Sequence, residues 1–245
     1  LMIERLKKQQ DKLILSERHA AWENVARKLA HEIKNPLTPI QLSIDRLREK
    51  YLEKISDGKD NFSKYLDTMN KQIKDIENLV NEFSDFARMP KPLLKKNNLN
   101  EIIDENIKLI SKLDSSINIK LINHMAKDVI LNFDYEQFNR LFFNLIKNSI
   151  ESIQEKAEKD NKIDKNIDIE IRERRDYIII NILDTGIGFK DKKTKDLIKP
   201  YFTTKEKGTG LGLSIVDKII SDHNGSIKFL NHKNGAKIQI IIPIK

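Results

Sequence analysis

The residues whose types and spacing could do chemistry begin with His31, Glu32 and Asn35, within the stretch LAHEIKNPLTPI. Apolar residues recur at spacings of three and four from Trp22 to Tyr51, which predicts one amphipathic helix. At about 100° per residue, His31 falls opposite the apolar stripe, and Asn35 follows one turn later on nearly the same face. The sequence therefore predicts an imidazole, a carboxylate and an amide on the exposed side of a helix.

Two prolines follow this histidine inside the same apolar pattern. Pro36 and Pro39 lack a backbone N–H, so we expect the helix to be weakened or bent beside His31. A lone exposed histidine on a helix is most often an ordinary surface residue. The prolines, together with a nucleotide-binding pattern in the C-terminal half, favour a histidine that accepts a phosphoryl group.

Two asparagines in the C-terminal half form a second candidate group. Asn144 and Asn148 are four residues apart, so they share one face of a predicted helix, with Lys147 alongside. Amide oxygens are hard ligands suited to Mg²⁺, which shares its coordination with waters and substrate phosphates. The ordinary alternative is a pair of surface amides.

Glycines mark two further segments. Asp184 ends an apolar run and is followed by Gly186 and Gly188, so its carboxylate could accept a hydrogen bond from an exocyclic amine while the glycines admit a ring. A second cluster precedes a predicted helix, where backbone N–H groups and the helix dipole favour phosphate; its glycines are Gly208, Gly210 and Gly212. Taken singly, these segments are equally typical of turns; in this order in one domain they indicate a nucleotide site.

Composition limits the remaining possibilities. The 245 residues suffice for about two domains, and no apolar run approaches the length of a membrane span. There is no cysteine, which excludes disulfides. The net charge of +8 comes from 45 basic residues scattered among 37 acidic ones, so we interpret them as solvated faces and expect no direct binding of nucleic acid. The first residue is Leu1, which suggests a fragment of a longer chain.

The N-terminal half predicts a helical hairpin. The first helix ends near residues 51–54, a turn follows at 55–61, and a second periodic helix covers 62–87 before a proline-rich break. Each apolar stripe is too wide for one partner helix, which predicts a homodimer with a four-helix bundle. The expected domains are an upstream signalling helix at 1–15, a dimerisation and phosphotransfer domain at 16–88, a linker at 89–98 and an ATP-binding domain at 99–245.

The C-terminal half alternates between helical and strand-like patterns. Helices are expected at 99–110, 135–156 and 211–223, and a loop at 189–209. Strands are expected at 117–123, 129–133, 167–173, 177–183, 225–231 and 235–244. This order predicts an α/β sandwich with a mixed sheet and helices on one face.

Five motifs in this order resemble those of the sensor histidine kinases of two-component systems. HEIKNPLTPI is similar to the H box, NLIKNSIESI to the N box, DTGIGF to the G1 box, PYFTTK to the F box and GTGLGLSIV to the G2 box. The resemblance runs from about residue 16 to the end of the chain. It is greatest to the nitrogen-regulation kinases of the membrane-anchored NtrY type. One departure is serine at 149 and 152, where many relatives have alanine.

The resemblance implies a Bergerat-type ATP-binding fold behind the dimeric hairpin. His31 would accept the γ-phosphoryl group, with Glu32 as general base and Asn35 positioning the phosphoryl group or a hydrolytic water. Asp184 would contact the adenine amine, while Asn144 and Asn148 would hold Mg²⁺ and Lys147 would assist with phosphates. The remaining residues implied to line the nucleotide or its lid are Gly186, Gly188, Phe202, Thr203, Thr204, Lys205, Gly208, Thr209, Gly210, Leu211 and Gly212.

The resemblance also implies partners. We expect transfer from His31 to an aspartate of a response-regulator receiver domain, NtrX-like, and a phosphatase activity on the phosphorylated regulator. A membrane anchor would lie N-terminal to this sequence, which would be the cytoplasmic portion. One alternative is a Bergerat-fold ATPase whose hairpin merely dimerises; another is a basic DNA-binding regulator, for which no recognition helix is evident.

Overall fold

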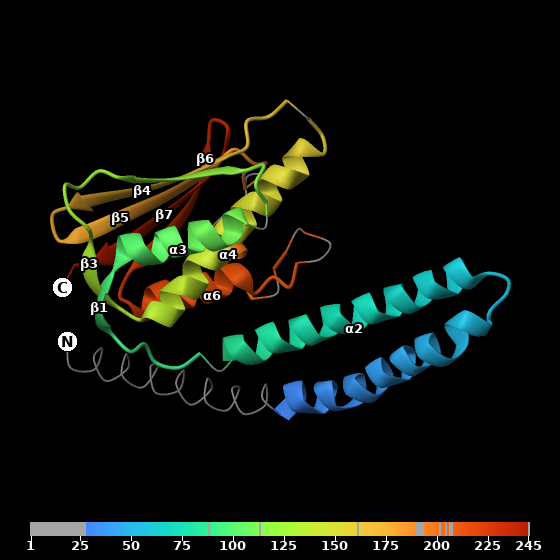
Figure 1. The fold of residues 1–245 in the computed structure, drawn as a ribbon. Helices are drawn as coiled ribbons and strands as arrows, with labels where there is room; N and C mark the ends of the chain where they lie inside the picture. The colour runs from blue at the N-terminus through green and yellow to red at the C-terminus, as the bar shows by residue number, and fades with distance from the viewer. Residues whose placement is uncertain are drawn as a thin grey trace. The chain divides into compact units, whose positions relative to one another are not determined.

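In the computed structural model, the chain forms two compact units with their boundary between Pro90 and Lys91 (Figure 1). The structure describes residues 28–87, 89–112, 114–160, 162–189, 194–200, 202–203, 205 and 208–244. The signalling helix predicted for residues 1–15 lies outside these ranges. The finer domain limits given by the sequence stay predictions.

The first unit is a hairpin of two helices. The first helix covers residues 28–51 of the described chain and continues through Pro36 and Pro39 without interruption. A short 3₁₀ helix, η1 (Leu52–Lys54), leads into a turn at Gly58, whose φ of +75° is a left-handed conformation that favours glycine. The second helix, α2 (Lys59–Ala87), then returns along the first.

The two helices pack through residues spaced seven apart. On the first helix the buried members are Ala30, Leu37 and Ile44, and on α2 they are Leu66, Ile73 and Val80. A hydrogen bond of 2.9 Å from Gln41 Nε2 to Asn70 Oδ1 and an ion pair between Arg48 and Asp67 flank this seam. Spacing by seven keeps one apolar seam facing its partner along the whole hairpin.

A second set of apolar residues, also spaced seven apart, is exposed in the single chain. Its members are between 40% and 51% exposed: Ile33, Ile40, Leu47, Met69 and Ile76. Only part of the predicted apolar stripe faces α2, because one helix cannot cover its full width. Between the helices lies an apolar groove of about 490 Å³, lined by Pro39, Ile40, Ser43, Ile44, Thr68, Met69, Gln72 and Ile73.

The second unit is an α/β sandwich. Its five-stranded sheet has the order β2-β4-β5-β7-β6, with β2 parallel to β4 and the other pairs antiparallel. These strands are β2 (Asn118–Asn123), β4 (Asn166–Arg174), β5 (Tyr177–Asp184), β6 (Ser226–His232) and β7 (Gly235–Pro243). The helices α3 (Leu99–Ser111), α4 (Tyr135–Ala157) and α6 (Gly212–Asp222) lie on one face of this sheet (Figure 1). The mixed sheet with helices on one face agrees with the prediction.

Two elements lie in segments without a periodic pattern of apolar residues. Strand β1 (Lys95–Asn98) falls inside the predicted linker and pairs antiparallel with β3 (Ile130–Phe133). Its residues, KKNN, are all polar, so neither alternation nor β-branching marks them as a strand. The four-residue helix α5 (Thr194–Leu197) lies in the predicted loop. Within the described part of the chain, no helix is both long and apolar enough to cross a membrane.

The core joins the start of α4 to the end of α6. The Phe133 and Phe138 rings stack with centroids 4.3 Å apart, and Phe138 meets the buried His223 edge-on. His223 Nε2 accepts from the Asp134 backbone N–H at 3.0 Å, so its Nδ1 carries the proton and donates to Ile219 O at 2.7 Å. Asp134 also caps α4 by accepting from Gln137 N at 3.0 Å. Both helices are thereby fixed beside the sheet.

We predict that Gly235→Ala destabilises the second unit through steric overlap. A Cβ at Gly235 would lie 2.2 Å from Asp184 O and 2.7 Å from Gly186 N, so backbone would have to move. The expected loss in the free energy of unfolding is about 2–3 kcal/mol, measured by urea denaturation. Gly58→Ala is the control: it has open space and should lose about 1 kcal/mol, from its left-handed backbone alone. Equal losses in the two variants would contradict the steric account.

Candidate active site

The first candidate group lies on the first helix of the hairpin. His31, Glu32 and Asn35 are all exposed, as the sequence predicts. Glu32 lies 3.9 Å from Lys28 Nζ, a solvent-exposed pair one turn apart that leaves the carboxylate available to other partners. The helix therefore presents an imidazole, a carboxylate and an amide within little more than one turn.

The prolines affect the backbone of this same turn. Because Pro36 and Pro39 have no N–H, the carbonyl groups of Glu32 and Asn35 lack their usual helical donors. The helix continues, but two of its backbone hydrogen bonds are missing in the turns next to His31. The segment that presents the histidine is held less firmly than the rest of the helix.

The second candidate group lies on α4 and faces the start of α6. Asn144 Nδ2 donates to Arg140 O at 2.8 Å, which leaves its oxygen pointing away from the α4 backbone. A Cβ at Gly212 would lie 3.2 Å from Asn144 Oδ1 and 3.7 Å from Asn148 Nδ2. Glycine at the first residue of α6 therefore lets the helix N-terminus approach both amides. The structure brings Asn144 and Asn148 together with the glycine-rich segment at the start of α6.

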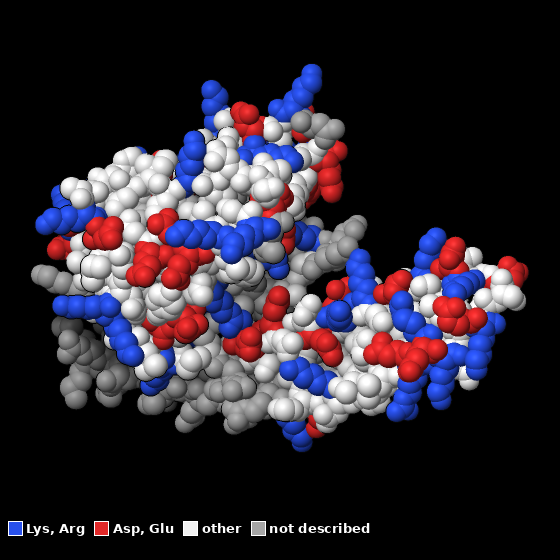
Figure 2. All heavy atoms as spheres, in the orientation of Figure 1, with Lys and Arg blue, Asp and Glu red and all other residues white. Residues whose placement is uncertain are grey.

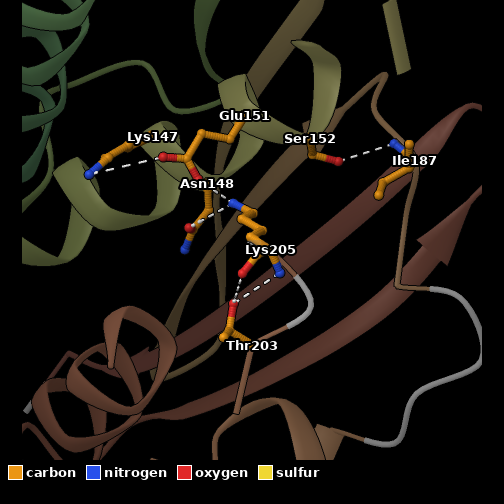
Figure 3. A network of polar contacts seen from close by, with 7 residues as sticks. All are labelled: Lys147, Asn148, Glu151, Ser152, Ile187, Thr203 and Lys205. Carbon is orange, nitrogen blue, oxygen red and sulfur yellow. Dashed lines mark hydrogen bonds and ion pairs between the residues drawn. The ribbon is translucent and has the colours of Figure 1, made fainter. Parts of the chain in front are cut away.

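A cationic side chain lies against one of these amides (Figure 3). Lys205 Nζ donates to Asn148 Oδ1 at 3.3 Å and forms an ion pair with Glu151. Glu151 also lies 4.0 Å from Lys147 Nζ. Glu151 follows Asn148 by three residues on α4, so the amide and the carboxylate share a face. This face of α4 therefore contacts the ammonium groups of both Lys147 and Lys205.

These residues fit a divalent cation. Asn148 Oδ1 already binds a cation, the ammonium group of Lys205. Asn144 Oδ1 points toward the N-terminus of α6. Hard oxygen ligands from two amides, with the rest supplied by phosphate and water, are the typical environment of Mg²⁺. The site therefore has the ligand types that Mg²⁺ requires beside a phosphate.

Asp184 ends strand β5 and is only 4% exposed. One carboxylate oxygen, Oδ1, accepts hydrogen bonds from Gly186 N at 2.9 Å and from Ala236 N at 3.2 Å. Burial raises the pKa of Asp184 above its ordinary value of 3.8, while the two backbone N–H groups, the Ser149 hydroxyl and the charge of Lys156 act in the opposite direction. A hydrogen-bond donor on a ligand would further favour the ionised form.

The glycine-rich segments contain two residues with a left-handed backbone and two that pack closely on other parts of the unit. Gly188 and Gly210 have φ of +72° and +70°, so both use the left-handed backbone open to glycine. Gly186 packs against α4, and Gly208 against Thr203 and Lys205. Thr209 Oγ1 accepts from Leu211 N at 3.4 Å, just before α6 begins.

The F-box segment is described in part. Phe202 N donates to Lys199 O at 3.1 Å, and Thr203 Oγ1 accepts from Lys205 N at 3.1 Å (Figure 3). Thr204 lies outside the described residues. The turn at Thr203 directs the Lys205 side chain toward α4.

Three residues near the site were missed from the sequence. Glu151 forms an ion pair with Lys205. Ser152 Oγ accepts from the Ile187 N–H at 3.1 Å, and Lys156 donates to the loop after Asp184. Ser152 and Lys156 continue the four-residue spacing of Asn144 and Asn148, and that spacing is the signal that could have found them.

Comparison with known families agrees with this arrangement. A family model described as His Kinase A (phospho-acceptor) domain matches residues 21–92, and one described as histidine kinase-, DNA gyrase B- and HSP90-like ATPase matches residues 133–245. The expected fold class, a helical hairpin domain followed by a Bergerat-type α/β ATPase domain, is confirmed. The chain therefore carries a phospho-acceptor domain followed by an ATPase domain, both of the kinds found in sensor histidine kinases.

Within that class the chain is similar to kinases of the NtrY type. It is 36% identical to nitrogen regulation protein NtrY of Azorhizobium caulinodans over 233 residues, 95% of this chain and 30% of that protein. It is 36% identical to a putative NtrY-like sensor histidine kinase of Rickettsia felis over 245 residues, 100% of this chain and 40% of that protein. The chain thus spans well under half the length of these curated relatives.

Solved structures show the same architecture. Histidine kinase ThkA in complex with response regulator protein TrrA matches with a TM-score of 0.65 and 25% identity, over 98% of this chain and 67% of that one. Full-length ShkA matches with a TM-score of 0.70 at 16% identity, over 89% of this chain and 45% of that one, a likeness of fold.

We predict that Asp184→Asn changes the pH dependence of stability. Because burial raises the pKa of folded Asp184 above 3.8, the wild-type fold binds more protons than the unfolded chain above that pH. Wild-type stability should therefore fall relative to the variant as pH rises above 3.8, and level off beyond the raised pKa. The asparagine oxygen can still accept from Gly186 and Ala236, so the variant should fold.

Urea unfolding of both proteins from about pH 4 to about pH 8 tests this. The free-energy difference between variant and wild type should grow with pH and then become constant. A difference that is flat, or that shrinks with rising pH, would show that the ionised form is not disfavoured in the fold.

Proposed function

We propose that this chain is the catalytic core of a sensor kinase that uses ATP to phosphorylate His31 and then passes the phosphoryl group to an aspartate of a response regulator. The observation that carries the proposal is the meeting of Asn144, Asn148 and the N-terminus of α6 in the unit that also buries Asp184. One domain then holds the two asparagines as metal ligands, the N–H groups of α6 for phosphate and the carboxylate of Asp184 for the base.

The transfer step balances with groups of this chain. An imidazole nitrogen of His31 attacks the γ-phosphorus of ATP, a P–N bond forms, and the bond to the β,γ-bridging oxygen breaks to release ADP. Neutral imidazole is the nucleophilic form. Glu32 takes the proton of the other ring nitrogen, or holds its tautomer. Catalysis of phosphoryl transfer is mainly positioning and charge neutralisation.

Mg²⁺ would be held by the amide oxygens of Asn144 and Asn148. When bound, it neutralises charge on the phosphates. Lys147, whose side chain is 53% exposed, and Lys205 lie on the same side of α4 and add positive charge for the phosphates. The Lys205 ammonium must leave Asn148 Oδ1 before that oxygen can bind the metal.

Asn35 supports a second activity. It lies on the exposed face one turn after His31, where an amide can orient a water molecule. We propose that it positions the water that hydrolyses the phospho-aspartate of the regulator. The solved complex of ThkA with TrrA shows a relative of this fold bound to a response regulator. An NtrX-like regulator is the partner we expect, and a membrane anchor would lie in a region outside this sequence.

The exposed apolar series of the hairpin supports a homodimer. Ile33, Ile40 and Leu47 repeat every seven residues beside the buried seam, and Met69 and Ile76 do the same on α2. Two such hairpins can bury these series against each other in a four-helix bundle.

The surface charge does not favour nucleic acid, since basic and acidic side chains are interspersed on the face seen in Figure 2.

We predict that His31→Gln abolishes phosphorylation of the chain. With radiolabelled γ-phosphate and Mg²⁺, wild type should gain label that is acid-labile and base-stable, and the variant at least about a hundredfold less. His124→Gln is the matched control, since His124 is exposed on the second unit. Label that persists in His31→Gln would refute this acceptor. ATP hydrolysis without label in either chain would favour an ATP-binding dimer without phosphohistidine.

We predict that Met69→Lys dissociates the dimer. Wild type should sediment with twice the 28.6 kDa of the chain, because Met69 lies in the groove that a second hairpin would cover. A buried lysine at that position would lack a partner for its charge. Asn78→Lys adds the same charge on the opposite side of α2, where it is exposed, and should stay dimeric. Equal masses for both variants would contradict this interface.

A further inference from the structure

One ridge of α4 extends beyond the two asparagines. Asn144, Asn148, Ser152 and Lys156 follow one another at intervals of four, so all four lie along the same side of the helix. The first two face the N-terminus of α6. The last two face the loop that follows Asp184.

Lys156 has an unusual set of partners for a half-buried lysine. Its Nζ donates to Thr185 O at 2.9 Å, to Gly186 O at 3.1 Å and to Asn234 O at 2.7 Å. An ammonium group has three donors, and all three are used on backbone carbonyl groups. The lysine thus acts on the position of the backbone, with no carboxylate among these partners.

Ser152 holds the next peptide of the same loop (Figure 3). Its Oγ accepts from Ile187 N at 3.1 Å. Gly186 packs so closely on Ser152 that a Cβ there would lie 2.2 Å from Oγ. The loop therefore lies directly on this side of α4.

The geometry of a trans peptide links these contacts to Asp184. In a trans peptide, the C=O and the following N–H point in opposite directions, and the described chain has no cis peptide bond. Lys156 binds Thr185 O, so the N–H of Gly186 points away from it and donates to Asp184 Oδ1 at 2.9 Å. Both ends of this peptide unit are fixed.

The next peptide unit repeats the arrangement. Lys156 binds Gly186 O, and the N–H of Ile187 donates to Ser152. Two successive peptides are thus held at both ends by side chains of α4 and by Asp184. Charge-assisted hydrogen bonds such as those of Lys156 are the stronger kind, and they polarise the peptides they bind.

Lys156 also joins this loop to the turn between β6 and β7. Its third acceptor, Asn234 O, lies in that turn, two residues before Ala236, whose N–H is the second donor to Asp184 Oδ1. Asn231 Oδ1 accepts from Phe189 N at 2.8 Å and holds the far end of the loop. Both N–H groups that fix the carboxylate therefore belong to segments that Lys156 ties together.

We propose that Lys156, assisted by Ser152, is a positioning residue that fixes the Asp184 carboxylate and thereby sets the preference for adenine over guanine nucleotides. The proposal rests on the proposed function, in which Asp184 accepts from the adenine amine. Adenine presents a donor at that ring position and guanine an acceptor. A carboxylate held in one place accepts a hydrogen bond from the adenine amine and repels the guanine oxygen. A mobile carboxylate can move away from that oxygen, so it discriminates less between the two bases.

The test compares Lys156→Met with Lys159→Met in the full chain. Lys159 is exposed in the turn that follows α4 and is paired with Glu155, so it matches in type without touching the loop. We expect Lys156→Met to raise the Kd and the KM for ATP about tenfold, the loss of roughly one charge-assisted hydrogen bond. The phosphorylation rate at saturating ATP should be unchanged, and the preference for ATP over GTP should fall by the same factor.

Two further variants make each outcome decisive. Ser152→Ala should change the ATP preference in the same direction by a smaller factor. If Lys156→Met does not unfold cooperatively, Lys156→Gln, which keeps one donor and no charge, replaces it with the same expected direction. The proposal is overturned if the ATP-to-GTP preference of the Lys156 variant equals that of Lys159→Met.

Asp184→Asn separates this proposal from the function on which it rests. Loss of ATP binding in Asp184→Asn together with an unchanged Lys156 variant would overturn the role of Lys156 alone. Wild-type ATP affinity in Asp184→Asn would instead overturn the contact between Asp184 and adenine.

Discussion

A carboxylate removed from water must be given other hydrogen-bond donors, and the ATPase domain is arranged around meeting that requirement at Asp184. The residue lies at the end of β5, where burial raises the pKa of its carboxyl group. Two backbone N–H groups replace the lost water, one from the loop after β5 and one from β7. Gly235 is needed because any side chain there would overlap the backbone of Asp184. The close approach of strand, loop and hairpin turn thus follows from one buried charge.

Helix α4 connects this constraint to the core. Its apolar face carries Phe138, Phe142 and other buried residues against the sheet, so the helix cannot rotate without loss of packing. Its four-residue ridge then places Asn144 and Asn148 at the α6 N-terminus and Ser152 and Lys156 at the loop. The His223 hydrogen bonds fix the ends of α4 and α6 relative to each other. Core packing therefore determines how far the N-terminus of α6 lies from Asp184.

The parts of this fold that could be predicted from sequence are those with local periodicity. Apolar residues at spacings of three and four, among them Leu37 and Ile44, predicted the helices of the hairpin, and the isoleucine-rich segments 167–173 and 177–183 predicted neighbouring strands. Strand β1 could not be predicted, since its polar residues are paired by β3 from a distant part of the chain. The spacing places Lys156 on the ridge of Asn144 and Asn148, but its contacts could not be predicted, because its partners are backbone carbonyl groups of segments 30 and 78 residues away. A side chain that binds backbone leaves no partner residue type in the sequence.

The two candidate groups have opposite physical requirements, which explains why they lie on separate units. Under the proposed function, His31 must be reached first by ATP and then by a receiver domain, so its side chain must stay exposed on a convex helix surface. The missing proline N–H groups thin the helix ladder beside it and allow local adjustment to two partners. Asp184 has to stay fixed and dehydrated to discriminate one base from another. A single rigid domain could not expose the nucleophile to two partners while it keeps the carboxylate buried, whereas two units with a boundary near Pro90 can satisfy both requirements.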